Sequence, residues 1–473
     1  MEKFDLIVIG GGSGINVASN AANDGMKVCL IERSQLGGTC TNNGCLPSKM
    51  LVYPAYVVRI LQDAKAVGIK NANIGIDFPM IMSRMRSAVD KRRTEIEEFI
   101  RSSDNVNLHQ GNAEFIGEYT LRVGDRIVTA PNIVIASGSR PMVPHIQGLK
   151  EAGYLDNISV LKLLKQPKSL IILGGGYIGC EYGHFFSAMG TKVTILGRNP
   201  RLLPNEDPEI SNMVKKVMSK NLKILTNHEA NKVEIRKGMK VITAKDRATG
   251  NEAQYEAEEI LEALGRISNS DTLNPEKTGV EIDRNGWIKV NEYLETSKPG
   301  IWALGDAIGK HMFKHTANYE ADIVSHNISS MEKVKVDFHA VPHAVFTYPQ
   351  VGAVGLTEAE AKTTGKNIMV GRARYTNVVH GVAMAEDDSL VKVVVEGDTE
   401  KILGCSIVGS EAAILIQQVV LLMNCGNQDL EPLRRSQVIH PALSEVLIKA
   451  FSDLEYPEST RDEASGESQE GQG

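Results

Sequence analysis

Two short stretches decide the fold of this chain, because they repeat each other. Residues 6–12 read LIVIGGG, and residues 170–176 read LIILGGG. Each is an apolar run of strand length that enters a glycine-rich turn, and a helix-length stretch rich in small residues follows. A second β-branched run then ends each copy, at 27–32 and at 192–196. The repeat predicts two strand–helix–strand units of the kind that bind dinucleotides.

The two turns differ in one glycine. The second copy contains all three glycines of the pattern G-x-G-x-x-G, at Gly174, Gly176 and Gly179. The first copy has Gly10 and Gly12, but Ile15 stands in the third position. The first two glycines let the backbone approach a pyrophosphate at the positive end of a helix, whereas the third serves helix–strand packing. Ile15 therefore affects local packing more than nucleotide binding.

Composition excludes several classes of protein. The 473 residues are enough for about three domains. Hydrophobic residues make up 42% and charged residues 23%, which excludes a disordered, collagen-like or membrane-spanning chain. The net charge is −6, and residues 457–473 hold five acidic residues against one arginine. The rest of the chain is nearly neutral, so we expect neither nucleic acid nor a membrane as partner.

The number of cysteines and the first residues of the chain indicate the cellular compartment of the protein. Six cysteines are too few for a disulfide scaffold in a chain of this length. The apolar run at 4–9 has the length of a strand and lacks the basic start and cleavage site of a signal peptide. We therefore expect a cytoplasmic protein.

Other segments predict further elements of an α/β fold. A long charged helix is expected over 78–103, a buried strand entering a tight turn over 130–138, and alternating strands over 222–264. A change in composition at 334–340 precedes a third, α+β part. Its predicted elements are strands at 390–396 and 402–408 and a helix at 412–423.

A redox site is indicated by residues 37–49, GGTCTNNGCLPSK. Pro47 suits the first turn of a helix, which places Cys45 at the helix N-terminus, where the dipole stabilises a thiolate. Lys49 adds a positive charge one turn later, and the glycines permit a turn that brings Cys40 within disulfide range. A zinc site is the alternative, but it needs a second ligand pair. The remaining cysteines are scattered and are expected to be core residues: Cys29, Cys180, Cys405 and Cys425.

Together these motifs resemble the FAD-dependent pyridine nucleotide–disulfide oxidoreductases. The resemblance covers roughly residues 4–455 and also rests on ASGSRP at 136–141, WALGDA at 302–307 and HPALSE at 440–445. It implies two Rossmann-like domains and an α+β dimerisation domain. The expected boundaries are 1–145 with 270–335 for FAD, 146–269 for NAD(P)H, 336–456 for dimerisation, and a disordered acidic tail at 457–473.

The resemblance also implies roles for individual residues. Cys45 would face the flavin, Cys40 would attack the substrate, and Lys49 would lie by the flavin, paired with Glu181. His440, oriented by Glu445, would protonate the leaving thiolate from the partner subunit of a homodimer with shared active sites. The implied FAD-binding residues are Gly10, Gly12, Gly14, Glu32, Lys49, Gly138 and Asp306. The implied NAD(P)H-binding residues are Gly174, Gly176, Gly179, Arg198, Arg201 and Gly265. No metal is implied.

The repeat itself predicts which nicotinamide is used. Glu32 lies seven residues after Gly25, and the same count from Gly190 reaches Gly197. An acid there would bind the 2′-hydroxyl of NADH and repel a 2′-phosphate. The acid is absent, and two arginines follow, at positions 198 and 201. Because a guanidinium suits phosphate, we expect NADPH, with NADH as the alternative.

The substrate is predicted only as a small disulfide or dithiol. Residues 315–320 match the H-x-A-x-x-E pattern of dihydrolipoamide dehydrogenases and mycothione reductase. We therefore expect an enzyme similar to dihydrolipoamide dehydrogenase, with an NADPH-dependent reductase of low-molecular-weight disulfides, similar to mycothione reductase, as the alternative. A mercuric reductase is disfavoured because no cysteine follows Cys425. A non-catalytic flavoprotein is disfavoured by the complete set of thiols, histidine and glutamate. His315 and His343 are expected to be structural.

Overall fold

The computed structural model describes residues 1–70 and 74–457. The predicted disordered tail therefore lies, apart from Pro457, outside the described residues. The chain forms two compact units, which are described separately: unit 1 comprises Met1–Pro204, Lys215–Val341 and Phe346–Tyr348, and unit 2 comprises Asn205–Val214, Pro342–Val345 and Pro349 onwards. Among the described residues, no helix is both long enough and apolar enough to cross a membrane.

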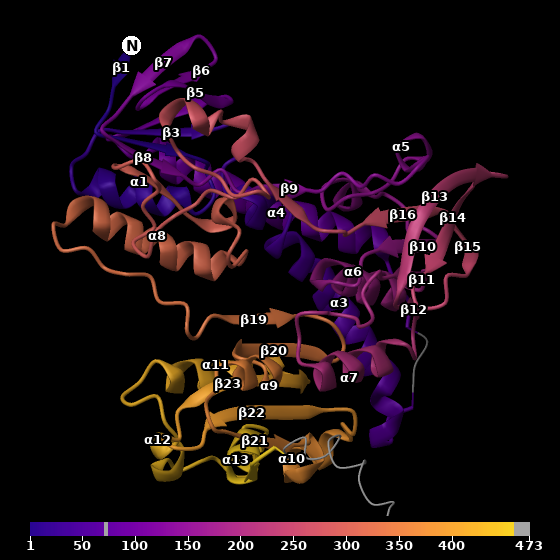
Figure 1. Cartoon of the computed structure of the whole chain (residues 1–473). Coiled ribbons are helices and arrows are strands. Elements are labelled where there is room, and N and C mark those ends of the chain that lie inside the picture. Colours follow the sequence, from indigo (N-terminus) through magenta and orange to yellow (C-terminus); the bar gives the residue numbers. More distant parts are fainter. Residues whose placement is uncertain (71–73, 458–473) are drawn as a thin grey trace, which may run out of the picture. The chain divides into compact units, whose positions relative to one another are not determined.

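Unit 1 contains the first predicted nucleotide-binding unit as a parallel sheet (Figure 1). The strand order is β18 (Ile301–Ala303), β8 (Asn132–Ile135), β2 (Leu6–Ile9), β3 (Val28–Glu32) and β4 (Val106–Gln110). Helix α1 (Gly14–Asn23) connects β2 to β3, as the sequence predicts. Every residue of β2 and β3 is buried, because helices or loops cover both faces of such a sheet.

The second copy of the repeat forms an independent parallel sheet in the same unit. Its order is β12 (Lys223–Leu225), β11 (Lys192–Leu196), β10 (Ser169–Leu173) and β16 (Glu259–Glu262). Helix α6 (Tyr177–Ala188) connects β10 to β11. Helix α7 (Pro208–Met218) precedes β12 in the chain, and its residues up to Val214 belong to unit 2. The two predicted strand–helix–strand units are thus confirmed.

The backbone of the two turns explains their glycines. Gly10 has a φ of 111°, and a Cβ there would lie 2.2 Å from the carbonyl oxygen of Ala136. Gly174 has a φ of 116°, and a Cβ there would lie 2.2 Å from the carbonyl oxygen of Ala263. Ile15 itself is buried. The close helix–strand approach of the first copy occurs instead at Gly14, where a Cβ would lie 2.8 Å from the Val8 side chain.

Further elements complete unit 1. A long α4 (Phe78–Arg101) matches the predicted charged helix, and Asp77 caps it by accepting from the backbone N–H of Met80. Smaller sheets consist of β1 (Glu2–Lys3), β7 (Arg126–Thr129), β6 (Thr120–Val123) and β5 (Ala113–Gly117); of β13 (His228–Arg236), β14 (Met239–Asp246) and β15 (Glu252–Ala257); and of β9 (Ser139–Pro141) and β17 (Arg266–Ser268). The other helices are α2 (Gly38–Asn42), α3 (Cys45–Asp63), α5 (Leu149–Ala152) and α8 (Lys314–Ser329).

Unit 2 is built on a six-stranded antiparallel sheet. Its order is β19 (Pro342–Val345), β20 (Gln350–Gly355), β23 (Ile402–Gly409), β22 (Leu390–Glu396), β21 (Ile368–Ala373) and β24 (Leu454–Glu455). Its helices are α9 (Glu358–Thr363), α10 (Val379–Met384), α11 (Ala412–Met423), α12 (Glu431–Arg435) and α13 (Glu445–Ser452). The strands and the helix predicted after residue 340 are therefore confirmed as an α+β arrangement.

One buried charge cluster secures the segment 205–214 within unit 2. The Lys392 side chain is only 4% exposed, and its ammonium lies 2.8 Å from Asp207, 2.7 Å from Glu209 and 2.8 Å from Glu358. A buried lysine is tolerated when carboxylates replace its hydration. The cluster ties this segment to β22 and to α9.

Candidate active site

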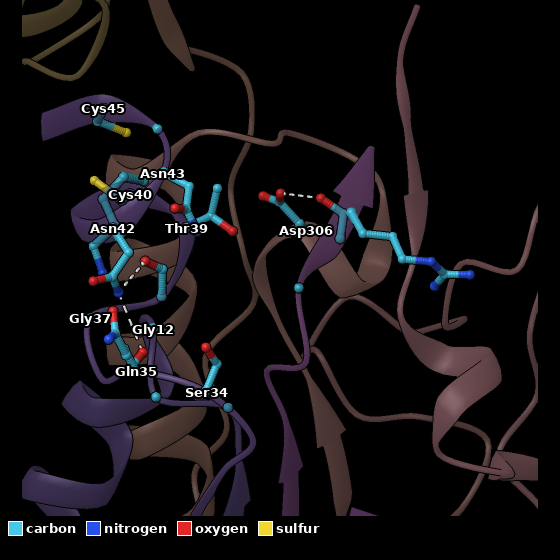
Figure 2. Close-up of a pocket in the computed structure, with 18 of the residues that line it drawn as sticks. Gly12, Ser34, Gln35, Gly37, Thr39, Cys40, Asn42, Asn43, Cys45 and Asp306 are labelled. Atoms are coloured by element: carbon cyan, nitrogen blue, oxygen red, sulfur yellow. Dashed lines mark hydrogen bonds between the residues drawn. The ribbon is translucent and has the colours of Figure 1, made fainter. Parts of the chain in front are cut away.

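The main cavity of unit 1 has a volume of about 770 Å³. Its walls come from the turn after β2, the end of β3, residues 34–45 and the loops after β8 and β18. Figure 2 shows Cys40 and Cys45 on one wall, with Asp306 projecting toward the same space from another. The carboxyl ends of parallel strands converge here, which is where such sheets bind ligands.

Glu32, the last residue of β3, holds the glycine turn after β2 in place by hydrogen bonds. Its Oε2 accepts a hydrogen bond of 2.7 Å from the backbone N–H of Gly11, and its Oε1 accepts one of 2.7 Å from that of Ser34. The carboxylate thereby fixes two backbone segments that line the cavity. Asn42 secures the adjoining loop, because its side-chain amide donates to the carbonyl oxygens of Leu36 and Gly38, both at 3.0 Å.

Asp306 lies in the loop that follows β18. The Ser139 hydroxyl donates to its Oδ2 at 2.5 Å, and the guanidinium of Arg266 lies 3.7 Å away. Gly138, with a φ of 68°, lies in the neighbouring loop. The Ser137 hydroxyl, which lines the same cavity, is buried and has no hydrogen-bond partner among the described residues. The cavity thus presents an unused polar atom, a carboxylate and close backbone turns, which together fit a dinucleotide.

The two motif cysteines lie together at the start of α3. Cys45 is the first residue of that helix, one position before the expected start, and Cys40 lies in the short helix α2, which was not predicted. Both are free thiols in this structure. A hydrogen bond from Cys40, aided by the charge of Lys49, lowers the pKa of Cys45 to about 7. The same hydrogen bond and burial raise the pKa of Cys40.

Lys49 and Glu181 form the ion pair that the family resemblance implied. The Lys49 ammonium lies 2.8 Å from both carboxylate oxygens. Phe346 completes the arrangement: its backbone N–H donates to Glu181 at 3.1 Å, and its ring centre lies 4.4 Å from the Lys49 ammonium. Phe346 is 165 residues from Glu181 in sequence, so no local signal could have indicated this contact.

His440 and Glu445 form a second pair, which belongs to unit 2. Nδ1 of His440 lies 2.8 Å from Oε1 of Glu445, and the backbone N–H of Ala442 donates to Oε2 at 3.0 Å. These contacts lower the pKa of Glu445. Because His440 is 67% exposed, its Nε2 edge is available to an incoming group.

A smaller cavity of about 180 Å³ lies beside the second glycine turn. It is lined by Gly176, Gly265, Tyr177 and Glu262, among others. Gly174 and Gly179 do not line it but shape the turn: a Cβ at Gly179 would lie 2.1 Å from the carbonyl oxygen of Gly174.

Arginines gather at the end of β11. Arg198 and Arg201 are both exposed. The guanidinium of Arg247 donates to the carbonyl oxygen of Arg198 at 3.1 Å, so the fold adds a third arginine that the sequence did not indicate.

Within residues 1–70 and 74–457, no group of three or more histidine, cysteine or acidic side chains is arranged to hold a metal ion.

Sequence comparisons agree with this geometry. Residues 4–321 match the pyridine nucleotide-disulphide oxidoreductase family, and residues 341–451 match the dimerisation domain of that family. The chain is 33% identical to a mycothione reductase of Mycobacterium tuberculosis (strain ATCC 25618 / H37Rv) over 466 residues, which are 96% of this chain and 100% of the relative. It is 30% identical to a dihydrolipoyl dehydrogenase of Bacillus subtilis (strain 168) over 467 residues, covering 95% and 97%. It is 34% identical to a mercuric reductase of Staphylococcus aureus over 430 residues, covering 89% and 77%.

A solved structure is also similar. The HOCl-induced flavoprotein disulfide reductase RclA from Escherichia coli superposes with a TM-score of 0.84 at 29% identity, covering 95% of this chain and 99% of that one. The matched domains, the paired thiols and the two dinucleotide turns lead to one conclusion. This chain belongs to the pyridine nucleotide-disulphide oxidoreductases and is a flavoprotein enzyme that uses FAD and a nicotinamide nucleotide to act on a disulfide.

Proposed function

We propose that the enzyme moves two electrons between NADPH and a small disulfide through FAD and the Cys40–Cys45 pair. The observation that carries this proposal is the thiol pair itself. Cys45 begins a helix, shares a hydrogen bond with Cys40, has a pKa of about 7 and borders the main cavity. A thiolate that forms near neutral pH is the reactive species in disulfide exchange.

The main cavity would hold FAD. Gly10, Gly12 and Gly14 would receive the pyrophosphate at the start of α1, where backbone N–H groups and the helix dipole favour negative charge. Glu32 would bind the ribose, while Gly138, Lys49 and Asp306 would border the rest of the cofactor. When bound, FAD supplies a centre that accepts hydride from the nicotinamide and passes electrons to the thiols. We assign FAD to residues 1–145 and 270–335, the nicotinamide nucleotide to 146–269 and dimerisation to 336–456.

The thiols would then reduce the substrate in two exchanges. The Cys40 thiolate attacks one sulfur of the substrate disulfide, so that a mixed disulfide forms and the other half leaves as a thiolate. The Cys45 thiolate attacks Cys40, which restores the protein disulfide and releases the second half. Two electrons and two protons thereby convert one disulfide into two thiols.

His440 would protonate the departing thiolate. Glu445 accepts from Nδ1, which leaves Nε2 as the atom that carries the transferable proton. Residues 341–451 match a dimerisation domain. We therefore infer a homodimer in which each active site takes His440 from the partner subunit.

The nicotinamide would bind beside the second turn as NADPH. Gly174, Gly176, Gly179 and Gly265 would form the turn and its surroundings. The exposed Arg198 and Arg201 would bind the 2′-phosphate, with Arg247 beside them.

A low-molecular-weight disulfide is the substrate class that we favour in the reducing direction. The similarity to a mycothione reductase covers nearly the whole of both chains. A second candidate is oxidation of a dihydrolipoyl-type dithiol with NAD, and the similarity to a dihydrolipoyl dehydrogenase over nearly the whole of both chains supports it. The H-x-A-x-x-E segment at 315–320 is compatible with both candidates. The thiol chemistry suits the cytoplasm, where the sequence led us to expect this protein.

A substrate panel tests the proposal. The FAD-loaded enzyme is assayed with NADH and NADPH against disulfides of lipoamide, glutathione, coenzyme A, mycothiol and bis-γ-glutamylcystine. We expect at least one pair to turn over, and Cys40→Ser and Cys45→Ser to abolish that turnover while FAD stays bound. A Cys45→Ser enzyme with near wild-type turnover would refute the thiol mechanism.

Mixed dimers test the shared site. Cys40→Ser and His440→Ala subunits are co-expressed with different tags and the heterodimer is purified. One of its two sites then has both groups intact, so activity absent from either homodimer should reappear. A verified heterodimer without activity, or a fully active monomer, would contradict the shared site.

A further inference from the structure

The smaller cavity of unit 1 contains a carboxyl group that the proposed function does not use. Glu262 is the last residue of β16 and is only 4% exposed, and it lines the cavity together with Gly176, Tyr177 and Gly265. Its Oε1 accepts a hydrogen bond of 2.7 Å from the backbone N–H of Leu264, whereas its Oε2 has no hydrogen-bond partner among the described residues. A buried carboxyl oxygen without a partner is unfavourable, which indicates a site where a ligand supplies the missing donor.

The strand does not require a carboxyl group at this position. The two strand–helix–strand copies have the same register here: Leu173 of β10 lies opposite Glu262, and Ile9 of β2 lies opposite Ile135 of β8. In each copy the next residue is the alanine whose carbonyl oxygen a Cβ on the first glycine of the turn would meet at 2.2 Å. Ile135 is fully buried. The first copy thus forms the same strand and turn with an apolar residue where the second copy has an acid.

A second hydrogen-bond acceptor without a partner borders the smaller cavity. Asn157 lines both this cavity and the main one. Its side-chain N–H donates to the carbonyl oxygen of Asn43 at 2.9 Å, and its Oδ1 is buried and has no partner among the described residues. Arg266, which also lines the cavity, already donates to Ser139 through two of its nitrogens. Free acceptors favour a ligand with hydroxyl groups, because each hydroxyl brings a donor.

The order of the strands indicates which hydroxyl groups lie near Glu262. Strands β11 and β16 flank β10 on opposite sides, and Leu173 at the end of β10 is level with both Leu196 and Glu262 (Figure 1). A pyrophosphate at the turn after β10 has one strand end on either side, so the two nucleosides of a dinucleotide extend in opposite directions. Arg198, which we assign to the 2′-phosphate of the adenosine half, follows β11. The ribose that carries the nicotinamide then lies at the end of β16.

On the basis of the proposed function, which places NADPH at the second turn, we propose that Glu262 binds the ribose that carries the nicotinamide. Its Oε2 accepts a hydrogen bond from a hydroxyl group of this ribose, while the contact of Oε1 with Leu264 holds the side chain in place. The residue thereby orients the nicotinamide half of the nucleotide and takes no part in the hydride transfer itself. It performs for this ribose the task that we assign to Glu32 for the ribose of FAD.

Binding of the two halves of NADP to the oxidised, FAD-loaded enzyme tests this role without turnover. Calorimetric titration at pH 8 compares nicotinamide mononucleotide, which contains the ribose in question, with adenosine 2′,5′-bisphosphate, which does not. We expect Glu262→Leu to weaken binding of the mononucleotide and of NADP about 10- to 100-fold, because a charge-assisted hydrogen bond is lost, and to leave the bisphosphate unchanged. Arg198→Ala should give the opposite pattern for the two halves. Glu256→Leu, the same exchange at an exposed position of β15, is the matched control and should bind both halves as the wild type does.

A second variant and altered ligands identify the contact itself. Glu262→Gln can still accept from the N–H of Leu264, so it keeps the local structure even if Glu262→Leu does not fold, and it should weaken binding of the mononucleotide by a smaller factor. Mononucleotides that lack either the 2′- or the 3′-hydroxyl are titrated into the wild type and Glu262→Leu. At least one of them should bind more weakly than the parent compound to the wild type, and this difference should be absent in Glu262→Leu.

The possible outcomes separate this role from the proposed function. FAD-loaded Glu262 variants that bind the mononucleotide as tightly as the wild type overturn the role of Glu262 and leave the thiol mechanism intact. Equal losses for the mononucleotide and the bisphosphate also overturn it, because they show a disturbed turn rather than a lost ribose contact. A wild-type enzyme that binds neither NADP nor NAD overturns the proposed function, and this role with it.

Discussion

The turn at Gly10 and the turn at Gly174 share a backbone but differ at the end of the strand that follows. Their φ angles are 111° and 116°, and an added Cβ would meet a carbonyl oxygen at 2.2 Å in both. In the first strand–helix–strand copy, Glu32 accepts a hydrogen bond of 2.7 Å from the backbone N–H of Gly11. In the second, Gly197 stands in that place, and its Cα would lie 3.9 Å from a Cβ on Gly175.

The difference separates two tasks that a dinucleotide site performs. The shared backbone creates a space for a pyrophosphate at a helix N-terminus, and no side chain takes part in that. The end of the next strand sets the charge near the ribose. A carboxylate there is incompatible with a 2′-phosphate, whereas a glycine followed by arginines accommodates one.

The largest expected effect tests the shared backbone. Gly10→Ala and Gly174→Ala should each destabilise the protein by at least about 3 kcal/mol, because both the positive φ and the overlap with a carbonyl oxygen oppose a methyl group. Thermal unfolding of the two purified variants measures this. A variant that unfolds at the wild-type temperature would show that its turn does not have the described conformation.

The next-largest effect is expected on nucleotide selectivity, which depends on the residues at the end of β11. Arg198→Ala should weaken NADPH binding by roughly 1.5–3 kcal/mol and leave NADH binding nearly unchanged, because only the 2′-phosphate loses a charged hydrogen bond. Gly197→Glu places at this position the acidic residue that the first copy has at Glu32, and it should reverse the nucleotide preference toward NADH. Titration of each nucleotide by fluorescence measures both, with the exposed Arg236→Ala as control. Equal losses for the two nucleotides in Arg198→Ala would exclude phosphate recognition by this arginine.

A third prediction compares two buried carboxyl groups of unit 1, one on α8 and one at the end of β16. Burial raises the pKa of Glu320, beside Asp306, to about 7, and it also raises that of Glu262 at the end of β16. The folded state therefore favours protonated Glu320, so its contribution to stability is complete below pH 4.5 and is lost as the pH rises through 7.

Glu320→Gln should remove this pH dependence. The amide resembles the protonated carboxyl and can still accept from the N–H of Gly305, as Glu320 does at 2.6 Å. We expect the variant to exceed wild type by on the order of 2 kcal/mol at pH 8 and to match it at pH 4.5. Urea unfolding at both values measures this, and Glu262→Gln should show a smaller change of the same sign. A constant difference across pH would mean that Glu320 does not titrate in this range.

The smallest effect on stability is expected at Gly176. A Cβ there would meet nothing within 4 Å, and its φ of −86° suits any residue. Gly176→Ala should change stability by no more than about 0.5 kcal/mol, yet weaken binding of the nicotinamide nucleotide. Nucleotide titration and thermal unfolding of the same sample separate the two. Unchanged nucleotide binding would show that the nucleotide does not approach this turn.

Much of the fold could be predicted because its signals are local. A buried parallel strand is a short apolar run, and a tight turn onto a helix needs glycine at defined positions. The strand and the turn at residues 6–12 and 170–176 can therefore be predicted from those residues alone. The start of α3 was predicted to within one residue, because Pro47 suits the first turn. The short helix around Cys40 was missed, because GTCTN contains no apolar period that would reveal it.

The two dinucleotide turns and the thiol pair could be found from the sequence alone, since each depends on residues close together in the chain. The distant groups that contact these features could be identified only from the fold. It brings Phe346 to the Lys49–Glu181 pair, Arg247 to Arg198, and Lys314 to Ser13 across 301 residues. These contacts have no sequence signal because a charge or a hydrogen bond acts over a few ångströms of space, whatever the separation along the chain.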